Sequence, residues 1–186
     1  MIGHTRVDVL YRFFPTETME GQENVAPIAR AIEAGTLRTV SSFAQIFAQS
    51  KLAFARATAA GELTDLVPDS WEVESIGRDA LLAGRVSWVI KRALGRVGDQ
   101  VFVGALATDP EWRGLVDEVL VAVAAGERWI AQTFVPQRRL RSVHGERFLT
   151  LGAYVLDGRF CGYFARITPT SHASHDALCV PVFVAS

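Results

Sequence analysis

The sequence predicts an α+β protein built on a largely antiparallel sheet. Helical patterns gather in the first part of the chain and strand-like runs in the last, with one amphipathic helix laid between strands. Asp157-Gly158 separates two of these runs and is a strong two-residue hairpin turn, so its flanking strands are expected to pair antiparallel. The strand-like runs after the amphipathic helix are 129–135, 147–156, 160–167 and 177–184.

Composition restricts the classes of protein that fit. The chain has 186 residues, of which 49% are hydrophobic and 21% charged, so it is expected to fold around a core. A net charge of −1 argues against a nucleic-acid partner held by counterion release. There is no uninterrupted apolar run of about 18 residues and no basic segment leading into an apolar one, so neither a membrane partner nor a signal peptide is expected. A cytoplasmic location is the default expectation.

The first part of the chain predicts a strand and two helices. Residues 6–14 alternate well enough for a strand, and an apolar strand so near the start needs a partner to cover its edges. Residues 24–34 predict a short helix with Asn24 as its N-cap. A second helix is expected to start at a capping box formed by Ser42 and Gln45 and to run to about residue 60.

The middle of the chain is less regular. Residues 62–87 form a broken pattern with a turn at 68–70 and a short helix over 78–83. Asp109-Pro110 then reads as an N-cap followed by proline at the first helical position, which predicts an amphipathic helix that closes at Gly126.

Residues 87–104 form the most informative stretch. An apolar run ends on Lys91, a turn containing Gly95 and Gly98 follows, and a second apolar run leads to Gly104. Glycine lets backbone N–H groups approach phosphate oxygens, and lysine supplies a point charge, so the stretch suits a lid over a polyphosphate. An ordinary β-hairpin with a surface lysine explains it equally well. Lys51 and Lys91 are the only lysines in the chain.

A series of short motifs in a fixed order resembles the circularly permuted ATP-grasp proteins of the glutathionylspermidine synthase type. The series spans nearly the whole chain and is carried by residues 7–15, Ser50-Lys51, 88–91 with Gly95, Gly98 and Gly104, 130–135, and 152–168.

The resemblance implies one ATP-grasp-like unit over 1–186, with a small nucleotide-lid lobe at 85–135 that carries the glycine loop. Such proteins join a carboxylate to an amine through an acyl phosphate made from ATP, so it implies an ATP-dependent carboxylate-amine ligase. Carried over by position, Lys51 and Lys91 reach the nucleotide phosphates, and Gly95, Gly98 and Gly104 belong to the phosphate lid. The hinge that reads adenine is Gln132, Thr133, Phe134 and Val135, and Arg166 is the catalytic arginine near the transferred phosphate.

The chain also departs from the family pattern. Family members hold Mg²⁺ with an Asp, a Glu and an Asn that precede the segment resembling residues 7–15, and only five residues precede Arg6 here. The resemblance therefore implies ATP and Mg²⁺ as cofactors, with no metal ligands in this chain and a unit incomplete at its N-terminus. The expected partners are a nucleotide and either a second copy or a segment that supplies the missing half. A non-catalytic nucleotide-binding or assembly module is the alternative.

Several polar residues leave two interpretations open. Gln132 lies in an apolar strand, and its amide is expected to bind either adenine or neighbouring backbone. The arginines of 137–141 are expected on a loop, where a solvated face is favoured over a phosphate clamp. Residues 172–176 are favoured as a polar loop over a metal or triad site. Cys161 and Cys179 sit in apolar runs and are expected to be buried reduced thiols.

Overall fold

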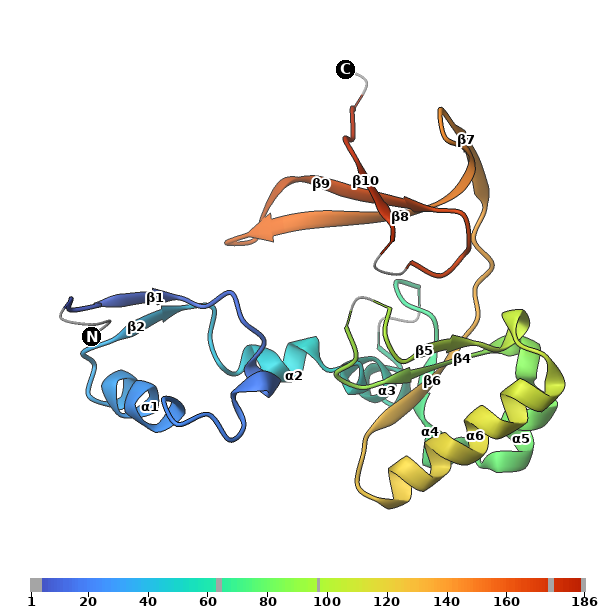
Figure 1. Cartoon of the computed structure of the whole chain (residues 1–186), viewed down its shortest axis with the longest axis horizontal. Helices are drawn as coiled ribbons and strands as arrows, with labels where there is room; N and C mark the ends of the chain where they lie inside the picture. The colour runs from blue at the N-terminus through green and yellow to red at the C-terminus, as the bar shows by residue number, and fades with distance from the viewer. Residues whose placement is uncertain (1–4, 63–64, 97, 174–175, 185–186) are drawn as a thin grey trace.

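The chain folds into three modules, which Figure 1 shows in a computed structural model describing residues 5–62, 65–96, 98–173 and 176–184. The N-terminal module comprises residues 5–50, the central module 51–135 and the C-terminal module 136–184. The predicted α+β class is confirmed, and the two larger sheets are antiparallel, each with four strands. None of the described helices has the length and apolarity needed to cross a membrane.

The N-terminal module is a small two-layer unit. Strands β1 (Val9–Tyr11) and β2 (Arg38–Val40) pair in parallel, and helix α1 (Val25–Glu33) connects them, as Figure 1 shows. A short 3₁₀ turn, η1 (Thr16–Met19), precedes α1. The helix begins after Asn24 as predicted, whereas the first strand is much shorter than 6–14 because only three of its residues find a paired strand.

The N-terminal module has no filled apolar core. Among its described residues only Arg12 is buried, and its guanidinium donates hydrogen bonds to the carbonyls of Phe14 (2.8 Å) and Ser42 (3.1 Å). Between α1 and the two strands lies a cavity of about 840 Å³, whose lining includes Leu10, Ile28 and other apolar side chains. The module therefore contributes little hydrophobic stabilisation of its own.

The helix predicted from Ser42 to about residue 60 is broken in two. Helices α2 (Gln45–Gln49) and α3 (Leu52–Ala59) are separated by an extended residue, Ser50, and by Lys51. The backbone N–H of Lys51 donates to the carbonyl of Ala93 (2.9 Å), so a contact with a distant loop replaces the helical hydrogen bond. The predicted capping box is also wrong, because the hydroxyl of Ser42 accepts from the N–H of Ala44 (3.2 Å).

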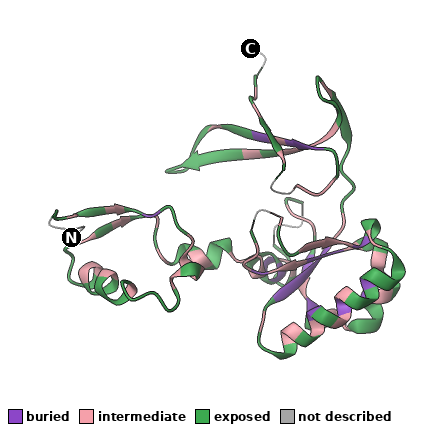
Figure 2. Cartoon of the chain, viewed as in Figure 1, coloured by how far each residue is buried: buried purple, intermediate pink, exposed green. Residues whose placement is uncertain are grey.

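The central module holds the main core. Its sheet has the order β3 (Ser70–Glu72), β6 (Trp129–Thr133), β4 (Trp88–Arg92), β5 (Val101–Val103), all antiparallel. Helices α4 (Val73–Ile76), α5 (Arg78–Ala83) and α6 (Asp109–Ala124) pack against it. Figure 2 shows buried residues concentrated here. The core comprises Val73, Leu81, Ile90, Trp112, Val116, Val119, Trp129 and Ala131.

Strand alternation separates the two faces of this sheet. Ile90 and Ala131 are direct cross-strand partners and belong to the core. Val89 and Gln132 are also partners, and they lie on the opposite face together with Lys91. The hairpin predicted at 87–104 is confirmed. The lobe expected over 85–135 covers only part of this module, which also includes α3, β3, α4 and α5.

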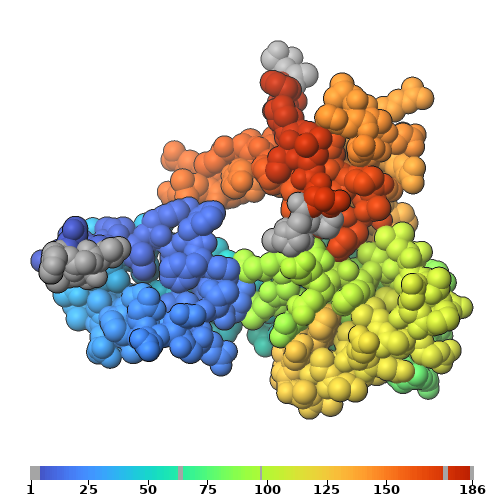
Figure 3. All heavy atoms as spheres, in the orientation of Figure 1, coloured from blue at the N-terminus to red at the C-terminus, as the bar shows by residue number. Residues whose placement is uncertain are grey.

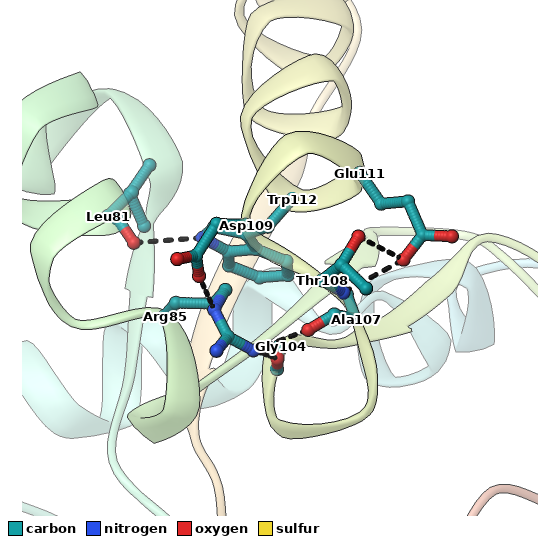
Figure 4. Close-up of polar contacts among 8 residues, drawn as sticks. All are labelled: Leu81, Arg85, Gly104, Ala107, Thr108, Asp109, Glu111 and Trp112. Atoms are coloured by element: carbon teal, nitrogen blue, oxygen red, sulfur yellow. Dashed lines mark hydrogen bonds and ion pairs between the residues drawn. The ribbon is translucent and has the colours of Figure 1, made fainter.

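Polar contacts fix the chain between β5 and α6, as Figure 4 shows. Two 3₁₀ turns, η2 (Arg85–Ser87) and η3 (Gly104–Leu106), lie side by side. The guanidinium of Arg85 donates to the carbonyls of Gly104 (2.6 Å) and Ala107 and pairs with Asp109 (2.6 Å).

The N-cap of α6 is Thr108, which corrects the expectation of Asp109. The backbone N–H and the hydroxyl of Thr108 both donate to the carboxylate of Glu111, at 2.8 and 2.7 Å. The helix ends as predicted, with Gly126 just beyond it in the left-handed region at φ 99°. One turn into the helix, the indole N–H of Trp112 donates to the carbonyl of Leu81 (3.0 Å).

The C-terminal module is a single sheet with the order β10 (Leu178–Val180), β9 (Arg159–Thr168), β8 (Gly145–Leu156), β7 (Arg139–Ser142). Asp157 and Gly158 form the predicted hairpin turn with φ values of 51° and 70°. Strand β7 corrects the loop expected over 137–141. The run 177–184 shortens to a three-residue edge strand.

The two cysteines are free but exposed, so the expectation of buried thiols is wrong. Cys179 lies on the edge strand β10, and Cys161 lies near the turn between β8 and β9. No second layer of described residues covers the sheet at either cysteine. The apolar sequence around Cys161 and Cys179 therefore does not lead to their burial.

Candidate functional site

Lys51 and Lys91 line one cavity of about 440 Å³. Its floor is the side of the central sheet that faces away from the core, and residues of the C-terminal module line the opposite side. Figure 3 shows the C-terminal sheet lying over the central module, with an opening beside it toward the N-terminal module. The predicted site residues that line the cavity are Lys51, Lys91, Gly98, Gln132, Thr133, Phe134 and Val135.

Strand β4 places Lys91 in this cavity. Its side chain points away from the core because Ile90, the preceding residue, points into it. The ammonium donates to the side-chain carbonyl of Gln132, with Nζ and Oε1 2.5 Å apart. Burial lowers the pKa of Lys91 below its ordinary value, and the positive charge of Lys51 lowers it further.

Lys51 reaches the cavity from the break between α2 and α3. Its Nζ donates to the carbonyl of Gly95 at 2.6 Å. Burial also lowers the pKa of Lys51, the charge of Arg96 adds to this effect, and the carboxylate of Glu17 opposes it. Two amines with lowered pKa values therefore face one cavity, and an anion between them would relieve their mutual repulsion.

The glycine loop, residues 93–100, connects β4 to β5 beside this cavity. Arg96 pairs with Glu17 of η1 (Nε to Oε1, 2.6 Å) and donates to the amide oxygen of Gln49 (3.1 Å). Gly98 has φ 81°, and a Cβ there would collide with the carbonyl of Ala173 in the C-terminal module. The loop thus contacts all three modules.

The two remaining lid glycines lie elsewhere. Gly95 presents its carbonyl to Lys51 but does not line the cavity. Gly104 follows β5 at the opposite end of the hairpin from the glycine loop, and a Cβ there would collide with the carbonyl of Arg85. The glycine at 104 is therefore explained by this close backbone approach, and the loop ends before it.

The hinge expected at 132–135, at the end of β6, has several of its polar groups in hydrogen bonds within the protein. The N–H groups of Thr133 and Phe134 donate to the carbonyls of Asp69 (2.9 Å) and Ser87 (2.8 Å), so neither is available to a base. The amide nitrogen of Gln132 donates to the hydroxyl of Ser70 at 2.9 Å. Gln132 thus has the protein partners that one of its two interpretations expects, a backbone carbonyl and in addition side chains.

Arg166 lies on β9, beyond the cavity lining. It is the cross-strand partner of Thr150 on β8, and Thr150 lines the cavity, so the two residues share one face of the C-terminal sheet. Arg166, for which a catalytic role is expected, therefore lies one strand away from the strand that lines the cavity.

Sequence reasoning missed part of the cavity wall. Thr150, Ser171, His172 and Gln137 line it, together with Pro68, which precedes β3. All of these residues except Pro68 belong to the C-terminal module, whose approach brings them to the lysines. Arg139, in the basic run 137–141, pairs with Glu146 (3.3 Å) outside the lining. His175 lies outside the described residues.

The described residues of the cavity do not fit a magnesium site. Its lining contains no aspartate or glutamate, and the described part of the chain holds no group of three histidine, cysteine or acidic side chains that could bind a metal ion. Mg²⁺ requires oxygen ligands, usually carboxylates, and the charged groups here are cationic.

Comparisons with known proteins give a similarity to solved structures alone. No protein-family model matches the chain, and no curated protein matches it significantly. Among solved structures, D-alanyl-alanine synthetase A from Vibrio cholerae O1 biovar eltor is similar, with a TM-score of 0.46 and 15% identity over 88% of this chain. The chain spans 46% of that protein, so it corresponds to about half of its length.

Proposed function

We propose that the chain binds the polyphosphate of a nucleotide, ATP first of all, in the cavity between Lys51 and Lys91. The observation that supports this is the convergence of the chain's two lysines on one cavity from separate elements. Two ammonium groups brought together and partly desolvated raise the energy of the protein alone, and an anionic ligand lowers it.

The walls of the cavity suit the rest of a nucleotide. Val89, Val101 and Val103 come from the sheet, and Phe134 and Val135 follow β6, so apolar surface adjoins the cationic end. A volume of about 440 Å³ lies within the range of small-molecule sites. A base would lie on the apolar part, with the phosphates near the two amines.

The finer proposal is that this is the ATP-binding part of a carboxylate-amine ligase of the kind that the motif series resembles. In such a reaction the residues of this chain would hold the γ-phosphoryl group and neutralise its charge by preorganised contacts. Lys51 and Lys91 would bind phosphate oxygens, and Arg166 would approach from the facing sheet.

The second candidate is a module that binds nucleotide without turning it over. The absence of carboxylates from the described cavity lining favours it for the isolated chain. Incubation with ATP and Mg²⁺ separates the two candidates. Phosphate release well above the rate of a Lys91→Met control indicates turnover, and release equal to that control indicates binding alone.

Calorimetric titration with ATP tests the binding proposal. Lys91→Met is expected to raise the Kd at least tenfold, which corresponds to about 1.4 kcal/mol. Arg113→Met removes one positive charge from an exposed position on α6 and serves as the matched control. Equal affinity in Lys91→Met and the wild type, with circular dichroism showing both folded, would reject the proposal.

A further inference from the structure

We propose that Gln132 is a positioning residue that holds the Lys91 ammonium at the cavity wall for an anionic ligand. This role differs from the adenine contact expected for Gln132 from sequence. It rests on the proposed function for the identity of the ligand, but the contacts that carry it are within the protein.

The orientation of the Gln132 amide is fixed by the chemistry of its neighbours. Its nitrogen donates to the hydroxyl of Ser70 (2.9 Å) and to the carbonyl of Pro68 (3.3 Å). A backbone carbonyl only accepts and an ammonium only donates, so the amide oxygen has to face Lys91. The observed Nζ to Oε1 distance of 2.5 Å agrees with this assignment.

The partners of the amide are themselves held by hydrogen bonds. Ser70 is fully buried, its backbone N–H donates to the hydroxyl of Thr58 on α3 (2.9 Å), and its own hydroxyl donates to the carbonyl of Pro68 (3.0 Å). Gln132 is 8% exposed and lies directly opposite Ser70 in the β3–β6 ladder. A chain of hydrogen bonds thus runs from α3 through β3 and β6 to the amine on β4.

This arrangement leaves Lys91 suited to an incoming anion. An ammonium has three N–H donors, and Gln132 takes one of them. The neutral amide oxygen favours the charged amine without cancelling its charge, unlike a carboxylate at the same position. Burial and the charge of Lys51 act in the opposite direction and lower the Lys91 pKa. Gln132 therefore helps to keep the amine protonated in a setting that disfavours its charge.

The first test measures the pKa of Lys91 without any ligand. Protein labelled with ¹³C in lysine gives two side-chain signals, assigned with Lys51→Arg and Lys91→Arg. The Lys91 pKa is expected to rise in Gln132→Glu, where a carboxylate faces the amine, and to fall in Gln132→Leu, where the acceptor is lost. Gln45→Leu, at an exposed position on α2, is the matched control and should leave it unchanged.

The order Glu above Gln above Leu for the Lys91 pKa, with a smaller response of Lys51, supports the proposal. An unchanged Lys91 pKa across the three folded proteins would overturn it. This readout does not require nucleotide binding, so it remains informative if ATP does not bind to the wild type.

The second test is a double-mutant cycle on ATP affinity. In the wild-type background, Gln132→Leu is expected to weaken ATP binding about tenfold. In the Lys91→Met background it should have little further effect, because Gln132 acts through the Lys91 ammonium. Equal losses in both backgrounds would mean that Gln132 contacts the ligand itself, and would overturn the positioning role. If the wild type binds no ATP, the proposed function fails while the pKa series still decides the role of Gln132.

Discussion

At the scale of single residues, the two lysines differ from the arginines that form ion pairs. Arg85, Arg96 and Arg78 are each paired with a carboxylate at 2.6 Å. Lys51 and Lys91 instead donate to neutral oxygens, a backbone carbonyl and an amide. Their charges are thus uncompensated by these contacts, which is the condition expected of groups that receive an anion.

The lowered lysine pKa values predict how ATP affinity depends on pH. Only the protonated amines attract phosphate, so affinity should fall as pH rises through their pKa values. Because both lie below the ordinary value of 10.5, the fall should begin at lower pH than for an unperturbed lysine. Titrations across the alkaline range check this. In Lys91→Arg, whose guanidinium stays charged, the decline should be smaller, and identical profiles would contradict the assignment.

The site was predictable from sequence only in part. The scarcity of lysine and the glycine turn after Lys91 pointed to the hairpin that lines the candidate cavity. The contact between Lys91 and Gln132 depends on the register of β4 against β6, in which Val89 lies opposite Gln132, and no local pattern specifies that register. The approach of Lys51 depends on a break in a helix that its sequence favours throughout.

At the scale of elements, local signals succeeded where neighbouring residues decide the structure. The Asp157-Gly158 turn, the end of α6 at Gly126 and the short helix α5 all formed as predicted. Local signals failed where a residue distant in sequence intervenes, as at Lys51, whose backbone N–H donates to the carbonyl of Ala93. The N-cap of α6 moved from Asp109 to Thr108 because Glu111 binds the threonine and Arg85 binds the aspartate.

The Thr108 cap predicts a measurable effect on stability. Thr108→Ala removes the hydroxyl that donates to Glu111, and loss of such a cap costs roughly 1 kcal/mol in the free energy of unfolding. Thr108→Ser keeps the hydroxyl and should stay near the wild type. Urea denaturation compares the three proteins. An Ala variant as stable as the Ser variant would show that the cap contributes nothing.

The same cap predicts that the fold loses stability at acid pH. Hydrogen bonds from Thr108 lower the pKa of Glu111 below its ordinary value of 4.5. A carboxylate with a lowered pKa stabilises the fold above the unfolded-state value, and this contribution is lost as pH falls through the folded-state value. Glu111→Gln should therefore lose stability near neutral pH and converge toward the wild type below pH 4.5. A constant difference in melting temperature between pH 7 and pH 3 would contradict this.

At the scale of the whole molecule, stability is distributed unevenly. The core cluster belongs to the central module, and Figure 2 shows few buried residues elsewhere. The described part of the N-terminal module buries no apolar side chain, and its only parallel pairing has three residues per strand. Small parallel pairs of this kind gain little without a covering layer on both faces.

Hydrogen exchange should reflect this distribution. Amides of β1, α1 and β2 are expected to exchange orders of magnitude faster than those of β4 and β6, because local opening there exposes little apolar surface. Mass spectrometry of peptides from the two modules measures the difference. Equal protection in the N-terminal and central modules would show that the former is stabilised by something beyond its own packing.

A core substitution tests whether the central module supplies most of the stability. Leu81 is fully buried against α6, and Leu81→Ala should lower the free energy of unfolding by roughly 2–5 kcal/mol. Leu106→Ala, at a position that is 61% exposed, is the matched control and should change it little. Thermal denaturation of both variants checks the expectation, and similar small losses would place the stabilising core elsewhere.

The most direct measurement follows the two lysine side chains themselves during titration with ATP. In protein labelled with ¹³C in lysine, the signals of Lys51 and Lys91 should shift together, saturate at the same ATP concentration and report raised pKa values in the complex. Adenosine without phosphates should leave both signals in place. If ATP moves neither signal, or moves only one of them without saturation, the two amines do not share an anionic ligand.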